Sequence, residues 1–223
     1  DKNFKKILEE VKYKACLKQK IYRNTLKTFK QFQLSAKGII DELNKHEIDE
    51  SVEITYQEKG AFEFEIKIGG DILLIYMHTN VFGFEPSHPL WKTGYLKEDP
   101  TRNYCGMINI YNFLSDSFKY NRVNDLGYLI GRTFVNKEKH FFVEGRRQLN
   151  FLFNDFINQK IERQSIIQIL EQSILYSMGF DLTIPSYRNV ASLSVGELMV
   201  ESASTRIKTA KKMGYRFSFD DEN

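Results

Sequence analysis

Apolar residues recur at helical spacing along the first part of the chain. Steps of three, four and seven positions place them on one side of a helix. The pattern predicts a helix from about Asn3 to Ala36, and we expect Gly38 to end it because glycine is a poor helix former. The apolar positions are Phe4, Leu8, Val11, Ala15, Tyr22, Leu26 and Phe29.

The period changes to two from Val52 onwards, where apolar residues alternate with charged ones as far as Ile68. Such alternation is typical of strands with one face toward water. Lys59-Gly60 and Gly69-Gly70 provide glycine where tight hairpin turns need a positive φ. We therefore expect a three-stranded antiparallel meander that ends near His78.

Residues 80–104 contain three of the four prolines of the chain: Pro86, Pro89 and Pro100. Proline at this density disfavours both a sheet ladder and a helix interior. The segment is therefore predicted to be a long loop, and long loops in compact domains are often functional.

A strand from Gly106 to Tyr111 and a short helix to Tyr120 are expected after this loop. A hairpin formed by residues 127–135 and 140–144 follows. Its register would place Arg132 opposite Glu144, a pairing that stabilises neighbouring strands.

Helical spacing returns after Gly145 and continues to Ile161. A second helix is expected from Ser165 to Met178, because Ser165 and Gln168 form a capping-box pattern and a glycine follows Met178. The same capping pattern at residues 194–197 predicts a last helix that ends at residue 214.

These elements predict an α+β fold, in which helices cover an antiparallel sheet made of the meander, a later strand and a hairpin. Ligand-sensing domains of the PAS and GAF type share this broad order, an analogy of fold because no motif here is diagnostic of either family. The chain is expected to form a single domain: residues 1–37 as a basic amphipathic helix, 50–145 as the sheet region with its loop at 80–104, and 146–214 as C-terminal helices.

Composition is ordinary for a globular protein, with 42% hydrophobic and 27% charged residues. The longest apolar run, from Ile72 to Met77, is far shorter than the roughly twenty residues that span a bilayer. The two cysteines, Cys16 and Cys105, lie in no metal-binding spacing. We therefore expect no membrane span and a cytoplasmic location.

Charge is unevenly distributed along the chain. Residues 1–37 carry eleven basic and three acidic side chains, so eleven minus three gives +8, and a total of +3 leaves −5 for the rest. Such a segment can bind nucleic acid or an anionic membrane. The simpler interpretation is a solvated helix face that the acidic stretch at 41–71 neutralises.

Polar and titratable residues are interspersed with apolar ones between Met77 and Arg147, which suggests a half-buried polar site because buried polar groups need partners. The leading hypothesis is a binding module, sensor-like and non-enzymatic, with a pocket between the sheet and the loop at 80–104. Its ligand would be a small polar or anionic molecule or a protein partner. The residues expected to bind it are His78, Asn80, Tyr111, Asn112, Lys119, Arg122, Arg132, His140 and Glu144.

Two alternatives involve chemistry. A hydrolase could use His78 or His140 as a base oriented by Glu144 or Asp116, but no nucleophile lies in a recognisable setting. These histidines and His88 have no regular ligand spacing, so no metal site is predicted.

The other alternative is nucleic-acid binding through the basic first helix, with or without metal-dependent phosphodiester chemistry. Glu63, Glu65 and Lys67 fit the acid, spacer and lysine pattern of metal-dependent nucleases, in which two carboxylates hold the metal. Any solvated strand gives the same alternation. The binding module is therefore favoured.

Overall fold

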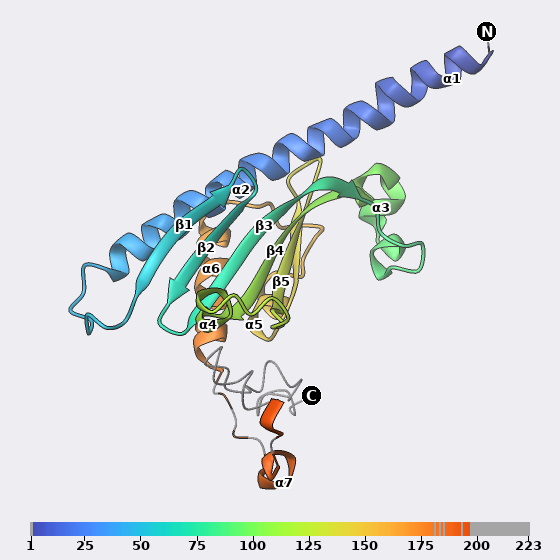
Figure 1. The fold of residues 1–223 in the computed structure, drawn as a ribbon. Coiled ribbons are helices and arrows are strands. Elements are labelled where there is room, and N and C mark those ends of the chain that lie inside the picture. Colours follow the sequence, from blue (N-terminus) through green and yellow to red (C-terminus); the bar gives the residue numbers. More distant parts are fainter. Residues whose placement is uncertain (1, 181, 183, 185, 193, 197–223) are drawn as a thin grey trace.

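The computed structural model describes residues 2–180, 182, 184, 186–192 and 194–196. It has an α+β fold in which six antiparallel strands follow one another in chain order across a single sheet (Figure 1). This confirms the predicted fold class. The strands are β1 (Ile54–Gly60), β2 (Glu63–Ile68), β3 (Asp71–Phe82), β4 (Cys105–Leu114), β5 (Tyr128–Asn136) and β6 (Phe141–Gly145).

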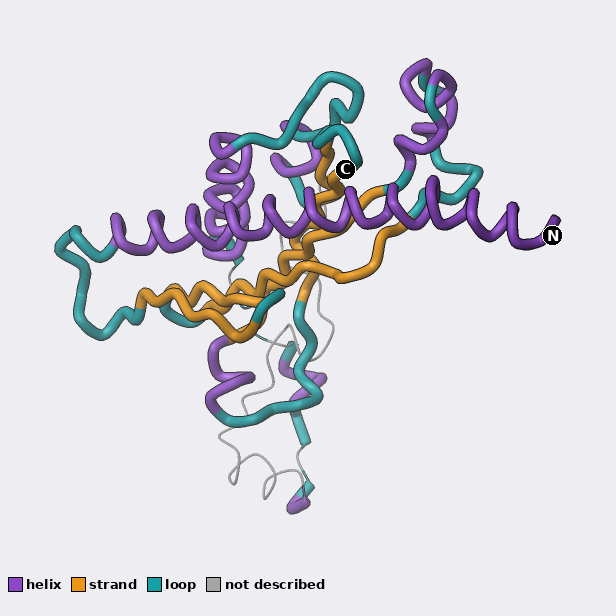
Figure 2. The backbone as a smooth tube through the Cα atoms, turned by 90° about the horizontal axis from the view of Figure 1, so that it is seen from above, coloured by secondary structure: helices purple, strands orange, loops and turns teal. Residues whose placement is uncertain are grey.

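A long helix crosses one face of the sheet, which we call the inner face. It consists of α1 (Lys2–Glu10), a π-helical turn η1 (Val11–Ala15) and α2 (Cys16–Leu43). Figure 2 shows that α2 follows the sheet whereas α1 projects beyond it. In the part of the chain that the structure describes, no helix has both the length and the apolar character needed to cross a membrane.

The expected helix end at Gly38 is wrong, because α2 continues to Leu43. Ile40, in the last turn, is only 2% exposed and belongs to the main core. Burying such a side chain contributes about 1.5–3 kcal/mol, which outweighs the roughly 1 kcal/mol cost of a glycine inside a helix.

The main core lies between the inner face, α2 and the C-terminal helix α6 (Arg163–Met178). Phe29 and Phe32 of α2 are fully buried in it. The helix approaches β4 most closely at Gly106, where an added Cβ would lie 2.0 Å from Thr25 Oγ1. A side chain at this position would therefore push the helix away from the sheet.

A second core forms on the opposite, outer face. Phe134 and Phe142 are nearly buried there together with Leu96, Cys105 and Phe156. The residues that cover them come from the segment at 83–103, so this segment packs on one end of the outer face.

That segment corrects the prediction of a loop at 80–104. Residues 80–82 extend β3, and three short helices follow: η2 (Pro89–Lys92), α3 (Gly94–Glu98) and η3 (Pro100–Asn103). Pro89 and Pro100 lie in the first turns of η2 and η3. The fixed φ and missing N–H of proline suit that position, so here the prolines begin helices.

The predicted turn positions are right in two of the three hairpins. Gly69 has a positive φ of 55° in the second turn, and Arg132 pairs with Glu144 across the last hairpin. In the first hairpin the prediction is wrong by one or two positions. Lys59 and Gly60 belong to β1, and the chain reverses at residues 61–62 after an irregularity in the ladder.

Two expectations fail after Gly145. The helix expected to reach Ile161 is the short α5 (Gln148–Leu152), because Phe153 packs into the main core and Phe156 into the second. The capping box at Ser165 is also wrong, since α6 begins at Arg163 without a side-chain cap.

Gly179 is the C-cap of α6, as predicted. The remaining short helices are α4 (Ser115–Lys119) and α7 (Tyr187–Val190), and α4 confirms the helix expected before Tyr120. Most of the helix predicted at 194–214 lies outside the described residues.

Candidate functional site

A row of polar side chains crosses the outer face of the sheet. The register pairs Glu63 with Tyr76, Tyr76 with Asn109, Asn109 with Arg132, and Arg132 with Glu144. Paired residues on neighbouring strands point to the same face at a strand spacing of about 4.8 Å, so the row is about 19 Å long. We call these five residues the outer-face row.

Asn109 lies at the centre of the outer-face row and is only 3% exposed. Ile108 and Ile110 on either side of it point into the main core, so the Asn109 side chain points to the outer face. Among the described residues, nothing accepts a hydrogen bond from its Nδ2. Leaving a buried donor unpaired costs about 1–3 kcal/mol, so this position needs an explanation. Within the described part of the chain, Thr133 Oγ1 and Gln159 Oε1 are buried without a partner as well.

Tyr76 and Arg132 flank Asn109. The ring of Tyr76 stacks on that of Tyr111 with centroids 6.1 Å apart. Burial, together with the adjacent Tyr111, raises the pKa of Tyr76. A side-chain hydrogen bond with Tyr111 acts in the same direction on the pKa.

Arg132 Nε donates to Glu144 Oε2 at 2.5 Å, and its guanidinium lies 5.4 Å from the centroid of the Phe134 ring. The two charged side chains are 43% and 38% exposed. Within the described residues the pairing uses only Nε, so the Nη groups of Arg132 add further donors beside Asn109.

The second core borders the outer-face row on one side. Met107, Phe134 and Phe142 form the next line of paired residues, and the ring of Phe84 lies 5.6 Å from each of those two phenylalanine rings. The row therefore lies beside the segment at 83–103, the part of the chain that the sequence associated with a binding site.

Four of the nine predicted ligand-binding residues share the outer face: His78, Tyr111, Arg132 and Glu144. The ring of His78 packs edge-on against Phe82, with centroids 4.8 Å apart. Its Nδ1 accepts a hydrogen bond from the backbone N–H of Asn80 at 3.1 Å. The side chain of Asn80 is exposed at the end of this strand.

Three other predicted residues are not in this group. Asn112 is fully buried opposite Leu73, a residue of the main core, and donates to Asp71 Oδ1 at 2.9 Å. Lys119 is exposed on α4. Arg122 is buried, with Nη1 3.8 Å from Asp125 Oδ2.

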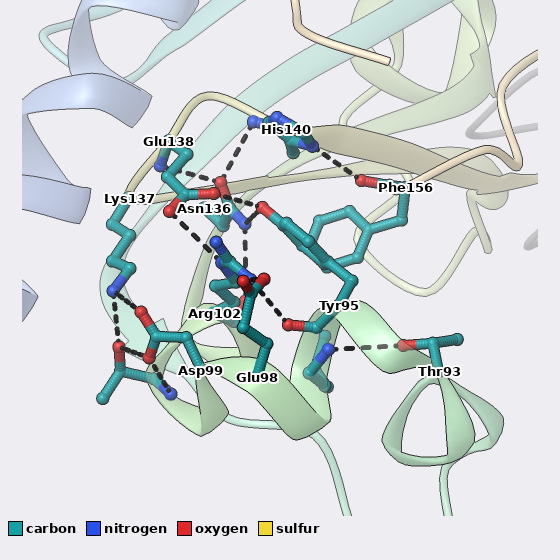
Figure 3. Close-up of polar contacts among 12 residues, drawn as sticks. Thr93, Tyr95, Glu98, Asp99, Arg102, Asn136, Lys137, Glu138, His140 and Phe156 are labelled. Atoms are coloured by element: carbon teal, nitrogen blue, oxygen red, sulfur yellow. Dashed lines mark hydrogen bonds and ion pairs between the residues drawn. The ribbon is translucent and has the colours of Figure 1, made fainter. Parts of the chain in front are cut away.

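His140 belongs to a separate polar network, shown in Figure 3, which joins the segment at 83–103 to the turn between β5 and β6. We call it the docking network. Tyr95 donates its hydroxyl proton to Glu138 Oε2 at 2.7 Å, and Asn136 Nδ2 donates to the Tyr95 oxygen at 2.9 Å. Arg102 Nε donates to Glu138 Oε1 at 3.2 Å, and its guanidinium lies 4.3 Å from the Tyr95 ring centroid.

Further contacts complete the docking network. Lys137 pairs with Asp99 and donates to Thr101 Oγ1 at 2.7 Å. The hydrogen bond from Lys137 lowers the pKa of Asp99 to about 2. His140 Nδ1 lies 3.1 Å from the Phe156 carbonyl oxygen, and its ring stacks on that of Tyr95 at 5.0 Å. These polar groups satisfy one another, so the network fixes one segment on another.

The contacts of the candidate bases do not match the expected hydrolase. Each expected base uses Nδ1 for a backbone group, Asn80 N–H for His78 and the Phe156 carbonyl for His140. Among the described contacts, the Nδ1 atoms of these histidines bond to neither Glu144 nor Asp116, the carboxylates expected to orient them.

Two residues of the nuclease-like pattern, Glu65 and Lys67, form ion pairs with residues outside the pattern. Glu65 Oε2 lies 3.2 Å from Lys59 Nζ, and Lys67 pairs with Glu53. Among the described residues, no group of three or more His, Cys, Asp or Glu side chains could hold a metal ion.

Sequence reasoning missed Tyr76 and Asn109. A signal for Asn109 was present, because it interrupts an apolar strand between Ile108 and Ile110. Alternation along the strand places it on the face opposite the core. The missing information was the identity of its neighbours on β3 and β5.

No protein-family model, curated protein or solved structure matches this chain.

Proposed function

We propose that this chain is a non-enzymatic module that binds a small polar or anionic ligand on the outer face of its sheet. The observation that carries the proposal is the Asn109 side chain, which is buried on that face with an unpaired Nδ2 donor. Nδ2 itself is buried, so a ligand oxygen reaches it only when the flanking side chains of Tyr76 and Arg132 move aside. Accepting its hydrogen bond would then recover the free energy lost by burying the amide.

The neighbouring groups favour an acceptor-rich ligand. The Tyr76 hydroxyl, Asn109 Nδ2 and the Nη groups of Arg132 are donors in adjacent positions of the outer-face row. Arginine pairs especially well with carboxylates and phosphates because its donors form a planar fork. Glu63 and Glu144 close the row at its two ends and disfavour additional negative charge there.

Thermal unfolding with defined probes tests this proposal. We would use inorganic phosphate, succinate and a nucleoside monophosphate, each over a range of concentrations. A probe at about one hundred times its Kd stabilises the folded state by about 2.7 kcal/mol. For a chain of this size the midpoint should rise by about 5–10 °C.

Three variants make the test specific. Asn109→Leu and Arg132→Met should abolish the rise in midpoint, because each removes a donor from the row. Lys119→Met removes an exposed cation from α4 and should leave the rise unchanged. If none of the probes raises the midpoint, or if Asn109→Leu responds like the unmodified chain, the proposal is wrong.

A reducing compartment, the cytoplasm, is part of this proposal. It is supported by the cysteines, since Cys16 and Cys105 are both free thiols and free thiols persist where disulfides are kept reduced.

Nucleic-acid binding through the basic N-terminal helix, with or without phosphodiester chemistry, stays a prediction. It requires affinity for duplex or single strands that falls steeply as salt rises.

A further inference from the structure

The N-terminal end of the long helix presents apolar side chains to solvent. Residues 2–16 are all exposed, and none of them contributes to either core. Phe4 is 63% exposed, Ile7 59%, Leu8 41% and Val11 53%. We call these four residues the α1 stripe. Their spacing of one, three and four places them on one side of the helix.

The α1 stripe faces away from the rest of the molecule. A cleft of about 670 Å³ separates this part of the helix from η3, and Lys6, Glu9 and Glu10 line it from the helix side. Phe4 and Leu8 are each two positions from Lys6, and Val11 is two positions from Glu9. Two positions correspond to about 200° around a helix, so the stripe lies opposite the cleft.

The π-helical turn η1 explains this orientation. It contains one more residue per turn than an α-helix, so the apolar side before the turn is out of phase with the core-facing side of α2. The sequence joined both into a single stripe from Phe4 to Phe29. In the structure Phe29 enters the main core, whereas Phe4 remains exposed beyond the sheet.

Lysines surround the α1 stripe. Residues 2–15, which form α1 and η1, carry five lysines and two glutamates, so five minus two gives a net charge of +3. Lys5 and Lys12 lie one turn from Leu8, at positions i−3 and i+4, and therefore border the stripe. An apolar stripe bordered by lysines is the pattern of a helix that lies in the plane of an anionic membrane surface.

We propose that α1 and η1 dock on an anionic lipid surface, with the α1 stripe in the headgroup region and the lysines against lipid phosphates. This site is independent of the ligand proposed for the outer face. A second copy of the chain fits less well, because two such helices repel each other and the stripe covers far less than the three to four heptads typical of a coiled coil. Nucleic acid would use the lysines but leaves the stripe without a role.

Co-sedimentation of the 223-residue chain with vesicles tests the proposal. Vesicles of phosphatidylcholine with about 30% phosphatidylserine should bind at least about tenfold more tightly than phosphatidylcholine alone, because each lysine near an anionic surface adds to the affinity. Added salt should weaken this binding.

The stripe and the lysines are tested separately. The double variant Phe4→Ser/Leu8→Ser should bind at least about tenfold more weakly, since two apolar side chains no longer leave water. Lys5→Glu/Lys12→Glu should remove most of the preference for phosphatidylserine. The matched control is Leu34→Ser in α2, which alters a side chain that is 71% exposed and should bind as the unmodified chain does.

Three outcomes would overturn the proposal. The first is equal binding to both kinds of vesicle. The second is binding to a DNA duplex, unaffected by Phe4→Ser/Leu8→Ser, without vesicle binding. The third is a dimer in sedimentation that the same double variant dissociates, again without vesicle binding. Unchanged thermal midpoints would show that the variants fold, as expected for side chains outside both cores.

Discussion

The docking network and the outer-face row are both made of polar side chains beside the second core, and they differ in how completely those groups are paired. In the docking network the side chains of Tyr95, Arg102 and Asn136 each have protein partners (Figure 3). In the outer-face row, Asn109 is buried with an unpaired donor. Pairing among protein groups indicates an architectural role, and the buried unpaired donor is the group on which we propose that a ligand binds.

The largest expected effect is in the docking network. Asn136→Ala should lower the free energy of unfolding by about 3 kcal/mol, at about 1 kcal/mol for each of the three shorter hydrogen bonds lost; a fourth, to the Arg102 carbonyl oxygen, is 3.5 Å long. The three shorter bonds join its side chain to the Tyr95 hydroxyl and to the backbone N–H groups of Glu138 and His140. Thermal unfolding should show a midpoint about 6–12 °C lower.

The control for this prediction is Asn150→Ala in α5, an exposed position where little change is expected. A loss no larger for Asn136→Ala than for the control would show that the network does not stabilise the fold.

Two buried asparagines of β4 should differ in how much their substitution changes stability. Asn112 is paired with Asp71, whereas Asn109 has an unpaired Nδ2. Asn112→Leu should cost about 2 kcal/mol because it removes the hydrogen bond from Asn112 to the Asp71 carboxylate. Asn109→Leu should be neutral or should stabilise the chain by up to about 1 kcal/mol. Urea denaturation measures both, and an equal loss in the two variants would remove the distinction between them.

Acid should weaken the docking network through Asp99. Its pKa of about 2 in the folded chain lies below the ordinary value. The stabilisation is therefore complete above about pH 4 and is lost as the pH falls from about 4 toward 2. We expect a contribution of about 1 kcal/mol, because the pair is partly exposed and screened by solvent.

Lys137→Met should remove this contribution. Unfolding free energies of the variant and the unmodified chain should differ at pH 5 and converge toward pH 2. A constant difference over this range would show that the Asp99–Lys137 pair is not its source.

The smallest effect on stability is expected for Arg132→Met. Its ion pair with Glu144 is about 40% exposed on both sides, and exposed pairs contribute roughly 0–1 kcal/mol. The unfolding free energy should change by less than about 0.5 kcal/mol while the ligand-induced rise in midpoint disappears. A large loss of stability would instead place Arg132 with the architectural groups.

The sequence alone determined the first helix, the meander and the later hairpin, and their order. Alternation of apolar and charged residues predicted the strands of the meander, because side chains on strands alternate between two faces whatever surrounds them. The turn after Asn136 predicted the pairing of Arg132 with Glu144, because turn length fixes the register of a hairpin. The separation of the first helix from the meander followed in the same way from a change of period.

Only the tertiary structure decided which polar groups have partners. Asn109 and Asn112 are the same residue type three positions apart in an apolar strand, yet one faces the donors of the outer face and the other faces Asp71. The same limit explains the segment at 83–103, whose prolines begin helices because Phe84 and Leu96 pack on the second core. A hydrogen-bond partner or a packing surface comes from residues distant in the chain, and local periodicity carries no information about them.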